Sequence, residues 1–169
     1  MAAALWVAGF FGCNQPKPTS TLEVDALVAQ FREVSNDTVE EVEQVVANAA
    51  QADRAVMFID LDWALTALYY RTYAQFMIKY HARHPTDPLH FHFVDCTPIT
   101  IDYKPLRELP GWQELIDESG TALIHGCGEI VWLDQGRVIH VQQITDFNSA
   151  QELVKLTEQL MPATDNPKN

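Results

Sequence analysis

The chain is short of basic residues, and this shortage excludes some classes of partner. Its 169 residues include 11 Lys and Arg against 23 Asp and Glu, which gives a net charge of -12. So acidic a protein is repelled by nucleic acid and by anionic lipid head groups, so neither is expected as a partner. The length and the 47% share of apolar residues fit one globular domain with a real core.

Cysteine is also scarce, and its spacing excludes the common cysteine motifs. Cys13, Cys96 and Cys127 form no CxxC pair and no zinc knuckle. An odd count argues against a closed disulfide framework, unless one cysteine has a separate role. The chain also shows no internal repeat, no interior linker and no Gly-rich phosphate loop. None of the standard catalytic motifs is therefore visible.

The first twelve residues, MAAALWVAGFFG, are almost wholly apolar and end directly before Cys13. This run is too short to span a bilayer as a helix, but it has the length of a signal-peptide core. A small residue before a cysteine resembles the lipobox of bacterial lipoproteins, although no basic residue precedes the run and Phe10 and Phe11 are unusual there. The resemblance implies an exported protein, periplasmic or membrane-anchored, whose lipid is attached to Cys13. The alternative is a cytoplasmic protein with an apolar N-terminus.

The clearest local pattern is VMFIDLDWALTALYY, residues 56–70. The apolar run Ala55–Ile59 predicts a strand that is buried on both faces. An acidic turn with Trp63 follows, and Ala64–Tyr80 predicts a helix that continues to about Arg83. Such a strand-to-helix corner is where α/β proteins place their sites.

Periodicity and turn residues predict the other elements. Thr38–Ala50 has the pattern of an amphipathic helix, whereas Leu22–Val34 fits either a helix or a strand. The turn Asp134-Gln135-Gly136 predicts a hairpin. The expected strands are Leu89–Val94, Glu129–Leu133 and Arg137–Ile144, with a short helix at Trp112–Glu118 in an otherwise irregular Ile99–Gly120 and a last helix at Ala150–Leu160. We expect an apolar segment and polar tether over 1–20, one domain over 21–163 and a polar tail over 164–169.

This order of elements resembles the thioredoxin fold from about Ala26 to Met161. VMFIDLDW is similar to the family's second strand and the lead-in to its Trp-Cys-x-x-Cys motif, with Trp63 at the position of that Trp. WLDQGRVI is similar to the family's hairpin. The resemblance implies a three-layer α/β/α domain that has a central mixed sheet and a C-terminal β-hairpin plus helix.

The departures from the family bear on function. At the positions of the two redox cysteines this chain has Ala64 and Ala67, at that of the buried acid Phe58, and at that of the cis-proline Gly128. Thiol–disulfide exchange requires a thiolate, which alanine cannot supply. The resemblance therefore implies a redox-inactive domain without a cofactor, which binds a protein or peptide near the Trp63 corner. The binding residues it implies are Asp62, Trp63, Ala64, Ala67 and Gly128.

An atypical thiol oxidoreductase is the alternative. In a thioredoxin-like sheet, Cys96 and Cys127 would both lie near the edge that holds the Trp63 corner, where they could pair or one could react. The simpler interpretation is that both are small buried hydrophobic residues, as most unpaired cysteines are.

Four histidines near the middle of the chain are weak candidates for metal ligands. His81 and His84 are spaced i,i+3 at a helix end, and His90 and His92 are spaced i,i+2 on one strand face, so each pair could share a ligand. Two prolines separate the pairs, and a helix C-terminus favours histidine through its dipole alone.

Overall fold

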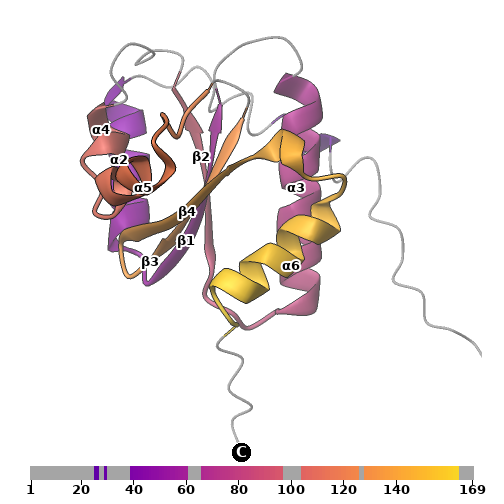
Figure 1. Cartoon of the computed structure of the whole chain (residues 1–169). Helices are drawn as coiled ribbons and strands as arrows, with labels where there is room; N and C mark the ends of the chain where they lie inside the picture. The colour runs from indigo at the N-terminus through magenta and orange to yellow at the C-terminus, as the bar shows by residue number, and fades with distance from the viewer. Residues whose placement is uncertain are drawn as a thin grey trace, which may run out of the picture.

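The computed structural model describes residues 25–26, 29, 39–60, 66–96, 104–125 and 128–163. In this part of the chain, a four-stranded sheet lies between helices on both of its faces (Figure 1). In chain order the elements are α2 (Val39–Gln51), β1 (Arg54–Asp60), α3 (Thr66–Arg83), β2 (His90–Asp95), α4 (Lys104–Arg107), α5 (Trp112–Ser119), β3 (Glu129–Asp134), β4 (Arg137–Gln143), the 3-10 helix η2 (Ile144–Asp146) and α6 (Ala150–Leu160).

The sheet is mixed, with strand order β2-β1-β3-β4. β1 and β2 are parallel and are connected through α3, whereas β3 runs antiparallel to both β1 and β4. The three-layer α/β arrangement predicted from the sequence, with a hairpin and a helix at its C-terminal side, is thus confirmed. None of the helices in the described part combines the length and apolar character needed to cross a membrane.

β1 is central because both of its faces are buried. Val56 and Phe58 belong to the core on the α3 and α6 side, whereas Met57 and Ile59 belong to the core on the α2, α4 and α5 side. Successive side chains of a strand point to opposite faces, so an apolar run without alternation is what a strand between two helical layers requires. The prediction from Ala55–Ile59 is confirmed.

The two cores differ in composition. The α3 and α6 side is rich in aromatic rings that contact one another, and the Phe58 and Tyr73 rings stack 5.1 Å apart. On the same side, Trp132 donates from Nε1 to Thr157 Oγ1 at 2.9 Å, which satisfies a buried indole. The opposite core, under α2, α4 and α5, is mainly aliphatic.

The β3–β4 hairpin forms as predicted through Gln135 and Gly136. Both have positive φ, 49° and 71°, as a type I′ turn requires. A Cβ on Gly136 would lie 2.1 Å from the carbonyl oxygen of Ala50, so the turn also packs against the end of α2.

The structure corrects the prediction for Ile99–Gly120, and most of Leu22–Val34 lies outside the described part. The stretch Ile99–Gly120 was expected to hold one short helix, but α4 precedes it, and its four residues are too few to show a periodic pattern. Of Leu22–Val34, residues 25, 26 and 29 are helical and the others lie outside the described residues. Ala64, the predicted start of the long helix, is also outside them, and α3 is described from Thr66 onward.

A buried arginine joins three parts of the chain at the start of β1. Arg54 forms an ion pair with Asp87, which precedes β2, and donates to the carbonyl oxygen of Met161, which follows α6. Tyr80 of α3 donates to the second oxygen of Asp87 and lies 3.4 Å from Arg54 Nη2. The three residues are at most 7% exposed, so the charges of Arg54 and Asp87 are balanced within the protein.

We predict that Arg54→Met destabilises the fold far more than the same change at an exposed arginine. Removing one partner of a buried pair leaves a buried charge, which costs about 3–5 kcal/mol of unfolding free energy. Arg71 pairs with Asp25 at 3.1 Å, and both side chains are about half exposed, so Arg71→Met is the matched control and should cost less than about 1 kcal/mol. Urea denaturation measures both, and equal losses would contradict the importance of the buried pair.

Two buried tyrosines make the fold sensitive to alkali. Burial raises the pKa of Tyr73, whose hydroxyl donates to the carbonyl oxygens of Val56 and His92. Burial also raises the pKa of Tyr80, and its hydrogen bond to Asp87 raises it further. Both groups therefore stay protonated in the folded state at a pH where the unfolded chain has lost these protons.

We predict that the free energy of unfolding falls as the pH rises through about 10, the ordinary tyrosine pKa. Above that pH the folded state binds more protons than the unfolded state, so the slope is negative, by up to about 1.4 kcal/mol per pH unit for each tyrosine. Urea denaturation between about pH 8 and about pH 11 measures this slope. Tyr73→Phe and Tyr80→Phe should each reduce it, and an unchanged slope in both variants would refute the assignment.

Candidate functional site

The described residues place one wall of the predicted corner at the carboxyl end of β1. Ile59 is paired with Glu129, the first residue of β3, so the segment that leads into β3 lies beside the end of β1. Gly128, which has no side chain, immediately precedes this pair. Its carbonyl oxygen accepts a hydrogen bond from Ile144 N at 2.8 Å. Gly128 is thereby fixed next to the start of η2.

Gly128 is packed against the first turns of α3. Its φ is +77°, and an added Cβ would lie 3.0 Å from Phe58, 3.1 Å from Ile144 and 3.2 Å from Tyr69. The structure thus brings the predicted position Gly128 against the ring of Tyr69, two residues after the predicted position Ala67. The structure shows no cis peptide bond in its described part.

Glu129 is a buried carboxylate at this corner that the sequence analysis did not single out. Its side chain is 1% exposed, and its Oε1 accepts from the backbone N–H of His125 at 2.7 Å. The His125 Nδ1 lies 3.8 Å from the same oxygen, on a half-exposed ring. A glutamate as the first residue of the apolar run EIVWLD was the available signal, since carboxylates are almost never fully buried without a partner.

Cys96 directly follows β2 and is fully buried. It belongs to the aliphatic core, together with Ile59, Val94 and Leu106. A cysteine in these surroundings behaves as a small hydrophobic residue, because reaction requires an accessible thiolate. Cys127, the second candidate thiol, lies outside the described residues.

The histidines lie in separate surroundings. His84 Nε2 contacts Glu158 Oε1 at 2.8 Å, and the His81 ring lies 5.1 Å from the Phe91 ring. The rings of His90 and His92 stack 6.4 Å apart on β2, and burial and the neighbouring His90 lower the pKa of His92. Among the residues that the structure describes, no three His, Cys, Asp or Glu side chains are grouped so that they could hold a metal ion.

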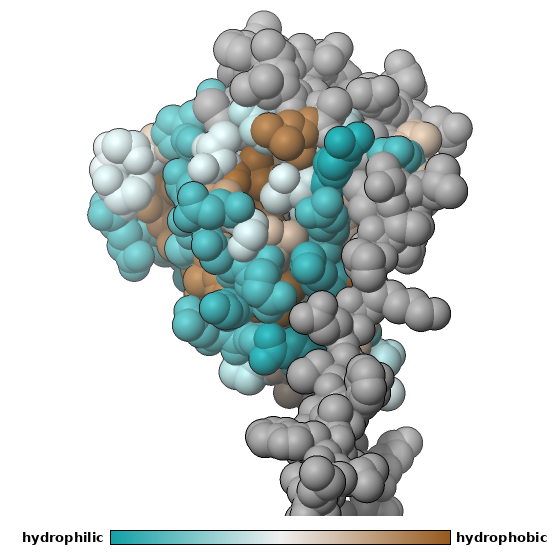
Figure 2. All heavy atoms as spheres, turned by 90° about the vertical axis from the view of Figure 1, so that its right-hand side faces the viewer, coloured by the Kyte–Doolittle hydropathy of each residue, from teal (hydrophilic) through white to brown (hydrophobic). Residues whose placement is uncertain are grey.

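Apolar surface is exposed at the start of α3. Leu68 is 58% exposed and is the one large hydrophobic side chain so exposed in the described ranges. Figure 2, which looks onto the α3 and α6 side, shows apolar surface among hydrophilic side chains in the upper part of this face, where α3 begins in Figure 1. Tyr69, next to Leu68, is half-buried. The corner therefore offers an apolar contact surface.

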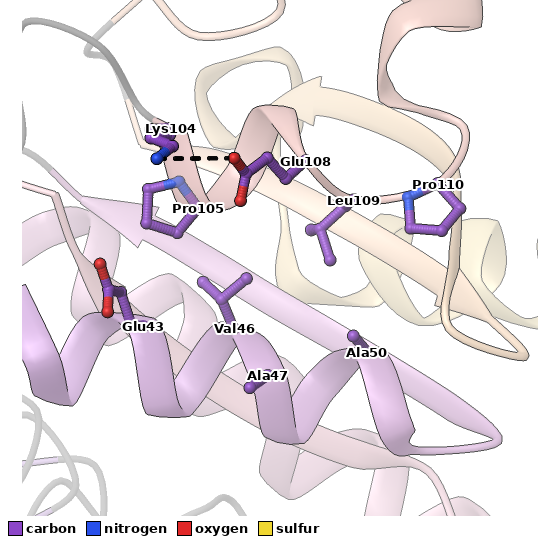
Figure 3. A pocket seen from close by; sticks show the side chains of 9 residues that line it. All are labelled: Glu43, Val46, Ala47, Ala50, Lys104, Pro105, Glu108, Leu109 and Pro110. Carbon is purple, nitrogen blue, oxygen red and sulfur yellow. Dashed lines mark ion pairs between the residues drawn. The ribbon is translucent and has the colours of Figure 1, made fainter.

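A groove lies on the other side of the sheet, between α2 and the segment 104–110 (Figure 3). Its volume is about 390 Å³. The nearly buried side chains of Val46 and Leu109 approach one another from its two walls. This groove could not be predicted from the sequence, because one wall contains α4, which shows no periodic signal.

Five predicted site residues lie outside the described part: Cys13, Asp62, Trp63, Ala64 and Cys127. Lipidation of Cys13, export and the binding role of the Trp63 corner therefore stay predictions.

Comparison with known proteins identifies no family. No protein-family model and no curated protein matches the chain. Among solved structures, a distant match is the solution structure of reduced desulfothioredoxin from Desulfovibrio vulgaris Hildenborough, a thioredoxin-like fold. The two sequences are 18% identical, the match covers 68% of this chain and 88% of that chain, and the TM-score is 0.43.

We predict that Gly128→Ala lowers the free energy of unfolding by about 2–4 kcal/mol, from left-handed backbone strain plus overpacking. Gly120, at the end of α5, is the matched control because its φ is also positive, +68°, but an added Cβ would meet nothing within 4 Å. Gly120→Ala should therefore cost only the backbone part, about 1 kcal/mol. Thermal or urea unfolding measures both, and equal losses would show that Gly128 does not pack tightly.

Proposed function

We propose that the protein is a thioredoxin-like, redox-inactive binding module, which captures an extended segment of another protein at the corner between β1 and α3. The observation that carries the proposal is the exposed Leu68 in the first turn of α3, directly after Ala67. In the thioredoxin resemblance, Ala67 takes the place of the second redox cysteine. An exposed apolar side chain therefore lies next to the position where the family has its second redox cysteine and this chain has an alanine.

The burial of Cys96 supports the absence of thiol chemistry. A thiol that attacks a disulfide must reach its sulfur, and Cys96 is fully buried in the aliphatic core. The alternative, an atypical oxidoreductase, would then depend on Cys127.

The fixed backbone at Gly128 supports binding. Phe58, Tyr69 and Ile144 surround Gly128, so the backbone at this one residue is held in place before a partner arrives. A preorganised site binds more tightly because no loop has to be ordered on association. Leu68 and the half-buried Tyr69 add apolar contact area, and tyrosine suits such surfaces because its ring is apolar and its tip is polar.

We predict that the full chain binds a permanently unfolded, carboxymethylated protein but does not accelerate the reduction of insulin by dithiothreitol. Fluorescence anisotropy measures the binding, and turbidity measures the reduction. Binding without catalysis is the expected result. Catalysis by the wild-type chain would refute the proposal in favour of a thiol enzyme, and the absence of binding would refute the capture of extended segments.

Matched variants separate the two parts of this prediction. Leu68→Ser should weaken binding severalfold, whereas Ala82→Ser, at an exposed position in the last turn of the same helix, should not. The double variant Ala64→Cys/Ala67→Cys should gain insulin reduction, because it creates a Trp-Cys-x-x-Cys sequence at residues 63–67, where α3 begins. A double variant that folds but stays inactive would show that the corner is not equivalent to the family's redox site.

A further inference from the structure

The groove between α2 and the segment 104–110 has two chemically different ends (Figure 3). At one end lie Glu43, Lys104 and Glu108, and at the other lie Ala50 and Pro110. Val46 and Leu109, which are 4% and 6% exposed, form the floor between them. A ligand that fills the groove must therefore be polar at one end and apolar at the other.

The polar end carries an excess of negative charge. The Lys104 Nζ lies 3.8 Å from Glu108 Oε1, in an exposed i,i+4 pair that balances one carboxylate. Glu43 is exposed and forms no ion pair with any residue that the structure describes. The charge of the whole chain, -12, has the same sign. A cationic group is therefore the complement of this end of the groove.

Both walls of the groove are held by contacts from outside it. Val138 N of β4 donates to Pro110 O at 2.8 Å, and the carbonyl oxygen of Ala50 lies against Gly136 of the hairpin turn. The main chain of the segment 104–110 is also folded by the bond from Leu109 N to Leu106 O, at 3.1 Å. The groove is thus formed before a ligand arrives, which reduces the entropic cost of binding.

We propose that this groove binds an extended segment of another protein that carries a Lys or Arg a few residues from an aliphatic side chain. The cation lies beside Glu43 and Glu108, and the aliphatic side chain lies between Ala50 and Pro110. Nucleic acid and anionic lipid do not fit, because the groove and the chain are acidic. This site is independent of the corner at Leu68, since α2 and α3 cover opposite faces of the sheet.

Two labelled synthetic peptides test the proposal with the full chain. One carries a Lys and a Leu separated by two Ser residues, and in the other Glu replaces the Lys. By fluorescence anisotropy, we expect the Lys peptide to bind about tenfold more tightly, and the difference to shrink as salt screens the exposed charges.

Neighbouring residues of α2 provide matched variants. Ala47→Trp, which fills the groove, should abolish binding, whereas Asn48→Trp at the next position, outside the lining, should not. Glu43→Lys should remove the preference for the Lys peptide, and Gln44→Lys should keep it. The unfolding curve of each variant checks that it is folded, and Leu68→Ser should leave peptide binding unchanged, which separates this site from the corner.

The outcomes that overturn the proposal are distinct. Equal binding of both peptides, or binding that Ala47→Trp leaves intact, would show that the groove does not select a basic segment. No binding of either peptide, as expected if a part of the chain itself fills the groove, overturns it too. So does a wild-type dimer that Ala47→Trp converts into a monomer, because a second copy is then the occupant.

Discussion

The buried pairing of Arg54 with Asp87 is the constraint on which the arrangement of the described elements depends. The guanidinium lies at the start of β1 and contacts Asp87, three residues before β2, the Tyr80 hydroxyl of α3 and the carbonyl oxygen of Met161, just after α6. These contacts join β1, α3 and the segment before β2 to the end of α6, which is far from them in sequence. We expect the need to match this charge in a low-dielectric interior to favour one mutual position of these segments.

The two cores on either side of the sheet also restrict where polar side chains can lie on β1. β1 has no polar side chain between Arg54 and Asp60, because each residue in between faces one of two apolar layers. Polar groups can therefore occur only at the two ends of the strand. One end is occupied by the Arg54 pair, and the other end is where Glu129 and Gly128 lie.

Elements with a repeating pattern could be predicted from the sequence. The unbroken apolar run gave β1, the spacing of valines gave α2, and Gly136 gave the hairpin, because each pattern follows from local geometry. α4 is too short to show a periodic pattern. The place of Glu129 in an apolar run indicated burial, but its position beside Ile59 of β1 depends on a contact between segments that are distant in sequence. The groove was missed for the same reason: its walls are α2 and residues 104–110, more than fifty positions apart.

The position of the Arg54 pair also bears on how this fold can evolve. It lies at the opposite end of β1 from the corner, about 20 Å away for a strand of this length. Substitutions at the corner therefore leave the buried ion pair and its matched charges intact. A side chain at the corner can therefore change without removing the contact that joins β1, α3 and the end of α6 at the opposite end of the strand.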